Sequence, residues 1–485
     1  MRKFNIILFF LSVAIITEAQ FINNGATVTI QSGATLRIES DFQNNTTGTL
    51  TNNGTLEVSG DFTNAATAIL TPSIGLIKFI GTANTDLDAG GDALNNVEMA
   101  KTANAKVTLS SPLSVDGNLS FTGTGSLIDI GTFDLTLGTS SLVNTPGSAG
   151  YVITGSTGNM VKKVSSDGSF TFPVGDDETD YTPLAVTYTG TGYTGTSAIK
   201  ARVIDAVHTD KPSFVTSYLS RYWKVESSNI SSPFSADYTG TYLPADVNGT
   251  QSQIVGASFV SPNWSYTNAA TNGSSTVSGT STSFSPDFSG LNKFAKLDLT
   301  AYIEGYMDGS SMRPVLLNSG LSYPATDCDN ITIALHNASS PYAEAHSYSG
   351  VLKTDGTLSC IYPGSAEGNS YFVVIKHRNA LQTWSASPVS MSVYNNYNFS
   401  TASSQAYGDN MVQVNGLWCM YSGNFDNTIP DDFIDLLDYS VWETDYNNFA
   451  SGYFQSDLNG DGYVDLLDYP FWQTNYNGFI EVLNP

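Results

Sequence analysis

The sequence predicts a mainly β protein built from several modules, with a small calcium-binding module of loops and helices at its C-terminal end. Three observations predict this fold class. Near the N-terminus, short alternating runs recur with a shift of 20 residues, which favours a parallel β-solenoid. In the middle of the chain, longer alternating runs bounded by turn residues predict two β-sandwich domains. At the C-terminal end, two acidic segments 30 residues apart each run into helix-compatible apolar spacing.

Residues 1–19 are predicted to be a signal peptide. Arg2 and Lys3 form a positive start, and Ile6–Ile16 is an apolar run of signal-peptide length, too short to span a membrane comfortably. Residues 17–19 place small side chains at the two positions that determine cleavage. No later stretch approaches a membrane span, so no transmembrane segment is expected after signal removal. The mature chain is expected to be secreted, extracellular or on a bacterial cell surface.

The acidic composition limits which partners the protein is expected to bind. The chain of 485 residues carries a formal net charge of −25 at pH 7. Phosphate binding needs a basic surface, so nucleic acid is not expected as a partner. Only 13% of the residues are charged, while Thr, Ser, Asn and Gly are abundant, as is typical of a β-rich extracellular protein.

The three cysteines leave the pairing open. Cys328, Cys360 and Cys419 all lie in the C-terminal part of the chain. An exported protein can keep a disulfide, so a Cys328–Cys360 pair is one alternative. At least one of the three cysteines must then be unpaired or intermolecular.

Residues 20–150 are predicted to form the β-solenoid. Four residues recur 20 positions later: Leu36, Ile38, Asp41 and Phe42 become Leu56, Val58, Asp61 and Phe62. Similar short runs, bounded by Gly, Asn or Asp, continue to Leu137. One coil cannot bury its apolar face alone, whereas stacked coils bury each other's faces. An antiparallel sandwich also alternates and turns often, and it is the alternative for this segment.

A solenoid can also carry a catalytic groove, as polysaccharide lyases and hydrolases do, which needs acids or bases clustered on one face. The candidate residues are scattered along the chain: Glu39, Asp41, Glu57, Asp61, Lys78 and Lys101. Asp41 and Asp61 occupy matched Asp-Phe turns, and stacked turn residues favour a structural role. No nucleophile–base pair stands out, so no catalytic residue is predicted.

Residues 151–298 and 299–420 are each predicted to form a β-sandwich. The first block opens at Tyr151 with longer strands than the solenoid, and the second alternates clearly in Ile331–Leu335 and Tyr371–Lys376. Both blocks have the size of an ordinary sandwich domain.

Two groups of residues in these blocks could bind a cation. The loop 176–180 holds four acidic residues, Asp176, Asp177, Glu178 and Asp180. Their spacing is not that of a defined ligand loop, which favours a solvated loop over a second cation site. His336 and His377 follow strong strands without metal-ligand spacing, and no Gly-x-Ser-x-Gly motif lies beside them. The histidines are therefore expected to form hydrogen bonds at strand ends.

The segment Asp457–Asp468 has the spacing of a calcium-binding loop. Oxygen-bearing side chains fall at loop positions 1, 3, 5, 9 and 12, as Asp457, Asn459, Asp461, Asp465 and Asp468. Gly462 occupies position 6, where the chain turns sharply, and the backbone carbonyl of Tyr463 at position 7 is expected to point inward. Carboxylates crowded into one loop repel one another by about 1–4 kcal/mol per pair at about 4 Å. A divalent cation removes that penalty, whereas the alternative is a solvated acidic turn.

The C-terminal segment holds a second copy of this motif. Residues 435–449 match residues 465–479 with an offset of 30. Each acidic loop runs into a short predicted helix with apolar spacing: Leu437 with Trp442, and Leu467 with Phe471 and Trp472. Pro470 lies where a first helical turn accepts proline. The two loop–helix units are expected to bury their aromatic side chains against each other.

Tandem loops of the pattern Asp-x-Asn-x-Asp-Gly-x-Val-Asp-x-x-Asp, each followed by one helix, make residues 421–485 resemble a type I dockerin module. Asp at loop position 12, here Asp468, is usual in that family. The resemblance implies two calcium ions and docking to a cohesin-like or other surface protein. More loosely, the order of signal peptide, solenoid, sandwiches and paired calcium loops resembles large secreted bacterial surface proteins, which implies display or adhesion.

The first loop departs from the dockerin pattern. The resemblance places positions 1, 3, 5, 7, 9 and 12 at Asn424, Asp426, Asp431, Phe433, Asp435 and Asp438. This alignment requires extra residues within 427–430, and it puts Asp432 at the turn position. A left-handed backbone there costs a non-glycine residue about 1–2 kcal/mol. The first calcium site is therefore expected to be weaker than the second.

The sequence thus predicts a secreted, non-catalytic surface or adhesion protein with a calcium-stabilised, dockerin-like interaction terminus. The repeats and the lack of a catalytic constellation favour this function. The alternative is an extracellular polysaccharide-degrading enzyme, a solenoid lyase or glycoside hydrolase that carries a dockerin. An extracellular glycan is a candidate partner in either case.

Overall fold

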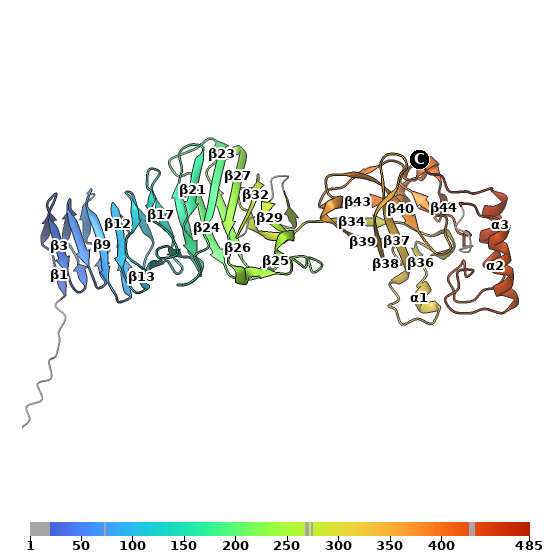
Figure 1. The fold of residues 1–485 in the computed structure, drawn as a ribbon, viewed down its shortest axis with the longest axis horizontal. Coiled ribbons are helices and arrows are strands. Elements are labelled where there is room, and N and C mark those ends of the chain that lie inside the picture. Colours follow the sequence, from blue (N-terminus) through green and yellow to red (C-terminus); the bar gives the residue numbers. More distant parts are fainter. Residues whose placement is uncertain (1–19, 72–73, 267–270, 273–274, 426–431) are drawn as a thin grey trace, which may run out of the picture. The chain divides into compact units, whose positions relative to one another are not determined.

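The computed structural model describes residues 20–71, 74–266, 271–272, 275–425 and 432–485. The chain divides into two compact units, Met1–Leu291 (unit one) and Asn292–Pro485 (unit two), which follow each other along the colour bar of Figure 1. The predicted signal peptide and the predicted ligands Asp426 and Asp431 lie outside the described residues. A helix with the length and apolar character needed to cross a membrane is absent from the described part of the chain.

Unit one begins as a parallel β-solenoid whose successive coils return to the same sheets. The eight-stranded sheet consists of β1 (Phe21–Asn23), β4 (Phe42–Asn44), β7 (Phe62–Asn64), β10 (Thr85–Asp88), β13 (Ala105–Leu109), β16 (Ser126–Asp129), β19 (Val152–Ile153) and β22 (Val174–Gly175). The six-stranded sheet consists of β3 (Thr35–Ile38), β6 (Thr55–Val58), β9 (Leu76–Gly81), β12 (Asn96–Lys101), β15 (Leu119–Phe121) and β18 (Val143–Asn144). A three-stranded sheet of β2 (Thr27–Ile30), β5 (Thr49–Asn52) and β8 (Ile69–Thr71) completes the first coils.

The alternation in the sequence decides which side chains line the solenoid core. In β6, Leu56 is buried and its neighbour Glu57 faces outward. The parallel register pairs Leu36 with Leu56 and Phe42 with Phe62, which reproduces the 20-residue shift found in the sequence. The prediction of a parallel solenoid is confirmed, and the antiparallel alternative for this segment is wrong.

A ladder of buried asparagines runs along the first coils. The Asn23 side-chain amide donates to Oδ1 of Asn44 at 2.8 Å, and the Asn44 amide donates to Oδ1 of Asn64 at 2.7 Å. All three side chains are buried. Each amide both donates and accepts, so the ladder satisfies polar groups that burial would otherwise leave unpaired.

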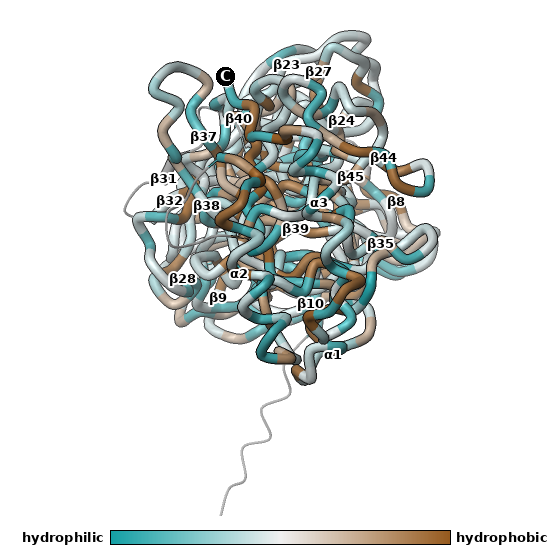
Figure 2. Tube along the Cα trace, turned by 90° about the vertical axis from the view of Figure 1, so that its right-hand side faces the viewer, coloured by the Kyte–Doolittle hydropathy of each residue, from teal (hydrophilic) through white to brown (hydrophobic). Residues whose placement is uncertain are grey.

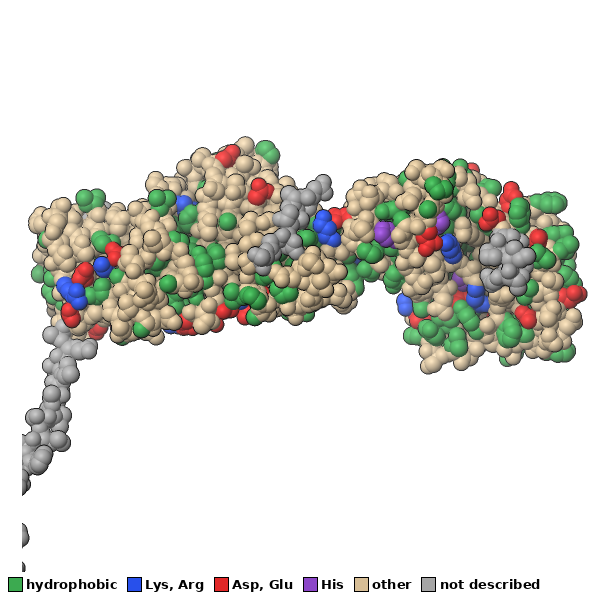
Figure 3. Space-filling view, viewed as in Figure 1, with side chains coloured by type: hydrophobic (Ala, Val, Ile, Leu, Met, Phe, Trp, Pro, Cys, Tyr) green, Lys and Arg blue, Asp and Glu red, His purple; other side chains and the backbone are tan. Residues whose placement is uncertain are grey.

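A row of alternating charges crosses the outer face of the six-stranded sheet. The strand register places Arg37, Glu57, Lys78 and Glu98 side by side on four successive strands. The Lys78 ammonium lies 3.0 Å from a Glu98 carboxylate oxygen and 4.0 Å from one of Glu57. Figure 3 shows red and blue side chains gathered together at this end of unit one.

The solenoid continues into antiparallel sheets without a break in the core. An eleven-stranded sheet consists of β11 (Ala93–Leu94), β14 (Leu113–Val115), β17 (Leu135–Leu137), β20 (Met160–Lys163), β24 (Ala198–Ile204), β26 (Tyr222–Ser228), β33 (Asp287–Asn292), β25 (Tyr218–Leu219), β28 (Val247–Asn248), β29 (Ile254–Val260) and β30 (Asn263–Ser265). Its strand β20 pairs in parallel with β17 and antiparallel with β24. A five-stranded antiparallel sheet consists of β21 (Gly168–Phe172), β23 (Leu184–Thr191), β27 (Ser231–Thr241), β32 (Thr276–Ser281) and β31 (Thr271–Asn272). One hydrophobic core extends from Ile30 to Phe288, so the segments on both sides of residue 150 share it.

In the part of unit two that the structure describes, the strands form two larger sheets and two hairpins. A three-stranded sheet consists of β39 (Thr357–Pro363), β34 (Phe294–Thr300) and β43 (Tyr394–Asn398). A five-stranded sheet consists of β38 (Glu344–Lys353), β37 (Asp327–Asn337), β40 (Ser370–Lys376), β41 (Thr383–Trp384) and β42 (Val389–Ser390). The hairpins are β35 (Met307–Asp308) with β36 (Ser311–Met312), and β44 (Val412–Val414) with β45 (Leu417–Cys419). The cysteines Cys328, Cys360 and Cys419 are all buried and free, so the Cys328–Cys360 pair is not formed.

The described residues of unit two form three α-helices: α1 (Val315–Asn318), α2 (Leu436–Asn447) and α3 (Tyr469–Asn477). The helices α2 and α3 face the viewer in Figure 2. The Asp435 side chain caps α2 by accepting a hydrogen bond from the backbone N–H of Leu437, and Pro470 lies in the first turn of α3, as predicted.

Candidate functional site

The segment 432–485 has internal two-fold symmetry. The backbone N–H of Val464 donates to the carbonyl of Ala450 at 2.9 Å, and the N–H of Ile434 donates to the carbonyl of Ile480 at 3.2 Å. Each residue of one bond lies 30 positions from its counterpart in the other. Each acidic loop therefore pairs with the chain that leaves the helix of the other repeat.

An aromatic seam joins α2 to α3 and follows the same symmetry. Ring centroids lie 5.0 Å apart for Tyr439 and Trp472, and 5.1 Å apart for the equivalent pair Trp442 and Tyr469. Both tryptophans are buried. The mutual burial of aromatic side chains expected from the sequence is therefore present between the helices.

The second loop, residues 457–468, is built around two buried carboxylates. The Asp457 carboxylate accepts the backbone N–H groups of Gly460 at 2.8 Å and Gly462 at 2.9 Å. The Asp468 carboxylate accepts those of Leu458, Asn459 and Asp465 at 2.7–2.9 Å. Neither carboxylate exposes measurable surface.

The three other side chains predicted as ligands lie between Asp457 and Asp468 in the same loop. Asn459 is buried, while Asp461 and Asp465 are partly exposed. Each accepts a backbone N–H two residues ahead, at 2.7–3.0 Å. Gly462 has a φ of +91°, the left-handed region that the turn position requires. The Tyr463 side chain is exposed, which leaves its backbone carbonyl as the predicted ligand atom.

Burial raises the pKa values of the two central carboxyls. Loss of hydration raises the pKa of Asp457 to about 6 and that of Asp468 to about 7. Within the described ranges, no Lys, Arg or His side chain lies within 4.0 Å of either carboxylate. Buried carboxylates without a cationic partner are costly, so the donor set fits a cation with hard oxygen ligands, as calcium is.

The first loop repeats the internal contacts of the second. The Asp438 carboxylate accepts the backbone N–H of Phe425 at 2.6 Å and that of Asp435 at 2.9 Å, as Asp468 does for the equivalent residues. Asp438 is buried, Asn424 and Asp435 are partly buried, and Phe433 is exposed. Asp438 therefore has in loop one the position that Asp468 has in loop two.

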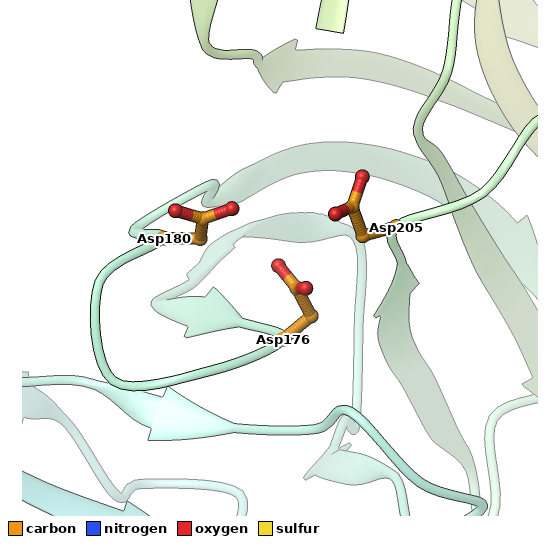
Figure 4. Close-up of side chains that lie close together, drawn as sticks. All are labelled: Asp176, Asp180 and Asp205. Atoms are coloured by element: carbon orange, nitrogen blue, oxygen red, sulfur yellow. The ribbon is translucent and has the colours of Figure 1, made fainter. Parts of the chain in front are cut away.

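A different group of acidic residues, in unit one, lies closer together than the carboxylates of loop two. Carboxylate oxygens of Asp176, Asp180 and Asp205 lie within 4.8 Å of one another (Figure 4). Among the described residues the carboxylates of loop two do not form such a group. The guanidinium of buried Arg221 lies 2.8 Å from Asp180 and 2.9 Å from Asp246, and it also contacts Asp176. The Arg221 guanidinium is therefore the cation that pairs with the acidic loop 176–180. The loop is not simply solvated, as its sequence favoured, and it does not have the spacing of a defined ligand loop.

Side chains from α1 and from two loops of unit two hold loop two in place through hydrogen bonds. The Asn379 amide donates to the carbonyl of Asp457 at 3.0 Å, and the Asn318 amide donates to that of Gly460 at 2.8 Å. Arg313 donates to the carbonyl of Asn459 at 3.3 Å. No sequence pattern marks these residues, because they lie about 80 to 145 positions from the loop and have no fixed spacing to it.

Both histidines form hydrogen bonds near strand ends, as predicted. His377 is buried against Asp329 at 3.2 Å, and Nδ1 of His336 lies 2.7 Å from the carbonyl oxygen of Tyr342. Asp329 also accepts hydrogen bonds from Arg378 at 2.9 Å and Tyr306 at 2.9 Å. These contacts hold the pKa of Asp329 well below its usual range despite its burial.

Acidic and basic side chains that are scattered along the solenoid form hydrogen bonds within the fold. Asp41 accepts the backbone N–H of Asp61 at 2.9 Å, and Asp61 accepts that of Asp86 at 2.8 Å, as stacked turn residues should. The buried Lys101 ammonium donates to the carbonyls of Ile80 and Ala83. A cavity of about 160 Å³ beside β11 is lined by two other acids, Asp92 and Asp116.

Large apolar side chains are exposed at equivalent positions of the two repeats. Patch one comprises Phe433, Leu436, Leu437 and Phe479, and patch two comprises Tyr463, Leu466, Leu467 and Phe449, each between 45% and 88% exposed. The backbone pairings described above place Phe479 beside loop one and Phe449 beside loop two. Both phenylalanines adopt a left-handed backbone, with φ of 54° and 50°. That conformation costs a non-glycine residue about 1–2 kcal/mol.

Comparison with known proteins yields one weak structural neighbour. No family model and no curated protein matches this chain. The chain is similar to a crystal structure of a type II cohesin–X-dockerin complex, an N-terminal interface mutant, from Acetivibrio cellulolyticus. The match has 15% sequence identity and a TM-score of 0.24, and it covers 38% of this chain and 95% of that chain. A neighbour at this level does not assign the chain to a family.

Proposed function

We propose that the chain is a secreted, non-catalytic surface protein whose residues 421–485 form a calcium-stabilised, dockerin-like module that binds another protein. The observation that carries the proposal is the duplication. A buried carboxylate at loop position 12 and an exposed apolar patch both recur 30 residues apart, on a pair of helices related by two-fold symmetry. The β-sandwich designation of residues 151–298 and 299–420 belongs to the same proposal.

Calcium would occupy loop two first. Asp457, Asn459, Asp461, Asp465, Asp468 and the carbonyl of Tyr463 would hold it, and the ion would neutralise carboxylates that burial isolates from water. The counterparts in loop one would hold a second ion: Asn424, Asp426, Asp431, Phe433, Asp435 and Asp438. Calcium would act structurally here, because the charges it neutralises lie beneath the surface that carries the apolar patches.

Patches one and two would form the docking surface. Exposed Leu, Phe and Tyr side chains grouped beside acidic loops suit a partner with an apolar centre and a basic rim, since no Lys or Arg follows Arg378 in the sequence. The dockerin resemblance points to a cohesin-like protein as that partner. The repetition of the patch allows either repeat to engage the same partner surface.

The binding experiment uses the full mature chain and a panel of immobilised cohesins. We expect binding in millimolar calcium, loss of binding in EDTA, and retained binding when only Leu436 or only Leu466 is changed to Arg. The double variant Leu436→Arg/Leu466→Arg should not bind. Leu142→Arg, an equally exposed leucine in unit one, is the matched control. Calcium-independent binding, or an unaffected double variant, would contradict the proposal.

The non-catalytic part of the proposal has its own test. The alternative enzyme is favoured by one observation, the cavity that Asp92 and Asp116 line. The Asp92 carboxylate has a structural role, because it accepts hydrogen bonds from the backbone N–H of Leu70 at 3.0 Å and from the Asn64 amide at 3.2 Å. Incubation of the full chain with a range of polysaccharides should release no reducing ends. Release that Asp116→Asn abolishes would establish the enzyme instead.

A further inference from the structure

A groove in the sheet region of unit two is separate from the loops and patches of the C-terminal module. It has a volume of about 750 Å³ and lies over β34, with β39, β43 and β38 contributing to its walls. This volume falls within the usual range for sites that bind small ligands, about 300–1,000 Å³. None of its lining residues belongs to segment 421–485.

The floor of the groove is a polar row across three strands. Leu297 and Leu299 of β34 point into the core, so Asp298 between them faces outward. The strand register places Ser359 of β39 and Asn396 of β43 on the two sides of Asp298. A carboxylate, a hydroxyl and an amide therefore stand next to one another at the strand spacing of about 4.8 Å.

Several groups that line the groove are available to a ligand. The side chains of Thr300, Asn396 and Tyr348 all line it, and within the described residues they form no hydrogen bond with the rest of the chain. The hydroxyl and amide groups can each donate and accept hydrogen bonds. The Tyr348 ring adds a planar apolar surface next to them.

The charges of the groove are compensated in pairs. The Lys296 ammonium lies 2.8 Å from the Asp298 carboxylate, and the Lys353 ammonium lies 2.5 Å from that of Asp327. The groove therefore offers no unpaired cation to a phosphate, sulfate or carboxylate. Asp298 is also the one carboxylate that lines it, whereas cleavage of a glycosidic bond ordinarily needs two.

We propose that this groove binds a neutral oligosaccharide without cleaving it. The Ser359 hydroxyl donates to the Asp298 carboxylate beside it, whereas the Thr300 hydroxyl and the Asn396 amide can donate to and accept from sugar hydroxyls. The Tyr348 ring would pack on the apolar face of one sugar ring. This site gives the chain a glycan-binding function that is independent of the calcium loops and of the docking surface.

The experiment titrates the full chain by calorimetry with cellohexaose, xylohexaose and mannohexaose, and with the galacturonic acid hexamer as the anionic comparison. At least one neutral hexamer should bind and the anionic hexamer should not. Tyr348→Ala and Asn396→Ala should each weaken binding by about tenfold, a loss of about 1.4 kcal/mol. Tyr323→Ala, a partly exposed tyrosine outside the groove, should leave binding unchanged.

Thermal unfolding separates loss of the site from loss of the fold. If the Tyr348→Ala variant unfolds at a lower temperature than the parent protein, its weaker binding could reflect a damaged fold. The test then depends on the binding of Asn396→Ala, whose side chain is exposed. Absence of binding to all three neutral hexamers would overturn the proposal. So would equal binding of the anionic hexamer, unchanged binding by a folded Asn396→Ala variant, or shortening of the bound hexamer.

Discussion

At the scale of single residues, the buried carboxylates of Asp457 and Asp468 explain the chemistry of the C-terminal module. Backbone N–H groups donate hydrogen bonds to both carboxylates, and burial removes them from water. This loss of hydration raises the pKa values of both groups. Proton uptake and the proposed calcium binding would thus be alternative ways to neutralise the same two groups.

The pH dependence of stability should therefore change sign with calcium. Without calcium, the folded pKa values lie above the ordinary 3.8, so unit two should become more stable as pH falls through about 7 and 6. With calcium bound, protons compete with the ion, and stability should decrease over the same window. Melting temperatures between about pH 8 and about pH 5, in EDTA and in millimolar calcium, check both slopes. If the melting temperature changed with pH in the same direction in both buffers, protons and calcium would not compete for the same carboxylates.

Removal of one ligand should reproduce chelation. Calcium at 100-fold excess over its dissociation constant stabilises by about 2.7 kcal/mol per site. The Asp461→Ala variant in calcium should therefore melt near the temperature of the parent protein in EDTA. Asp308→Ala, an exposed aspartate in the hairpin of β35 and β36, is the control and should respond to calcium like the parent. If Asp461→Ala keeps the full calcium shift, loop two is not the site.

At the scale of secondary-structure elements, the solenoid depends on contacts that repeat from coil to coil. Apolar residues fill its core, and polar side chains are used in two different ways. Inside, the amides of Asn23, Asn44 and Asn64 bond to one another. Outside, charges of alternating sign lie in register across the six-stranded sheet. Both ladders oppose a slip in register, because a shift by one residue would exchange the buried and the exposed sets.

Loss of one rung of the asparagine ladder should destabilise unit one. Asn44→Ala leaves Oδ1 of buried Asn64 without its donor and removes one acceptor of the Asn23 amide, which should cost about 1–3 kcal/mol. Gln43→Ala, at the adjacent outward-facing position, should change stability by less than about 0.5 kcal/mol. Urea denaturation of the two variants measures the difference. Equal midpoints would show that the ladder does not contribute to stability.

Reversal of one charge in the outer row should weaken the solenoid in a salt-dependent way. Lys78→Glu places three acidic side chains next to one another, because Glu57 and Glu98 lie on the flanking strands. The expected loss is about 1 kcal/mol at low salt, and it should shrink as salt screens the repulsion. Lys163→Glu, at a position without a described ion pair, is the control. A loss that does not respond to salt would indicate a packing effect instead.

At the scale of the whole molecule, the sheets of unit two and its C-terminal helices share a hydrophobic cluster. One hydrophobic cluster combines Phe372 and Trp384 of the sheets with Trp442 and Trp472 of the helices. Asn318, the last residue of α1, and Asn379, in the loop after β40, also bond to the backbone of loop two. Folding of the sheets and of the calcium loops should therefore be one cooperative event.

Calorimetry of the full chain should show this coupling. EDTA should lower the unfolding transition of all of unit two, and the transition of unit one should not move. Asn379→Ala should weaken the calcium response, because it removes a buried hydrogen bond to Asp457 that is worth about 1–3 kcal/mol when its partner is left unpaired. A separate calcium-sensitive transition for residues 421–485 alone would contradict a shared fold.

The sequence by itself determined the features that depend on local spacing. The 20-residue repeat predicted the solenoid register, and the 30-residue repeat predicted paired loops, helices and an aromatic seam, because each of these features is set by residues close together in the chain. Tertiary structure alone decided the features that join distant segments. It joined the segments on both sides of residue 150 in one continuous core, surrounded Arg221 with four acids from three places in the chain, and held loop two with Asn318 and Asn379. These contacts depend on how strands and loops pack in three dimensions, and packing leaves no periodic trace in the sequence.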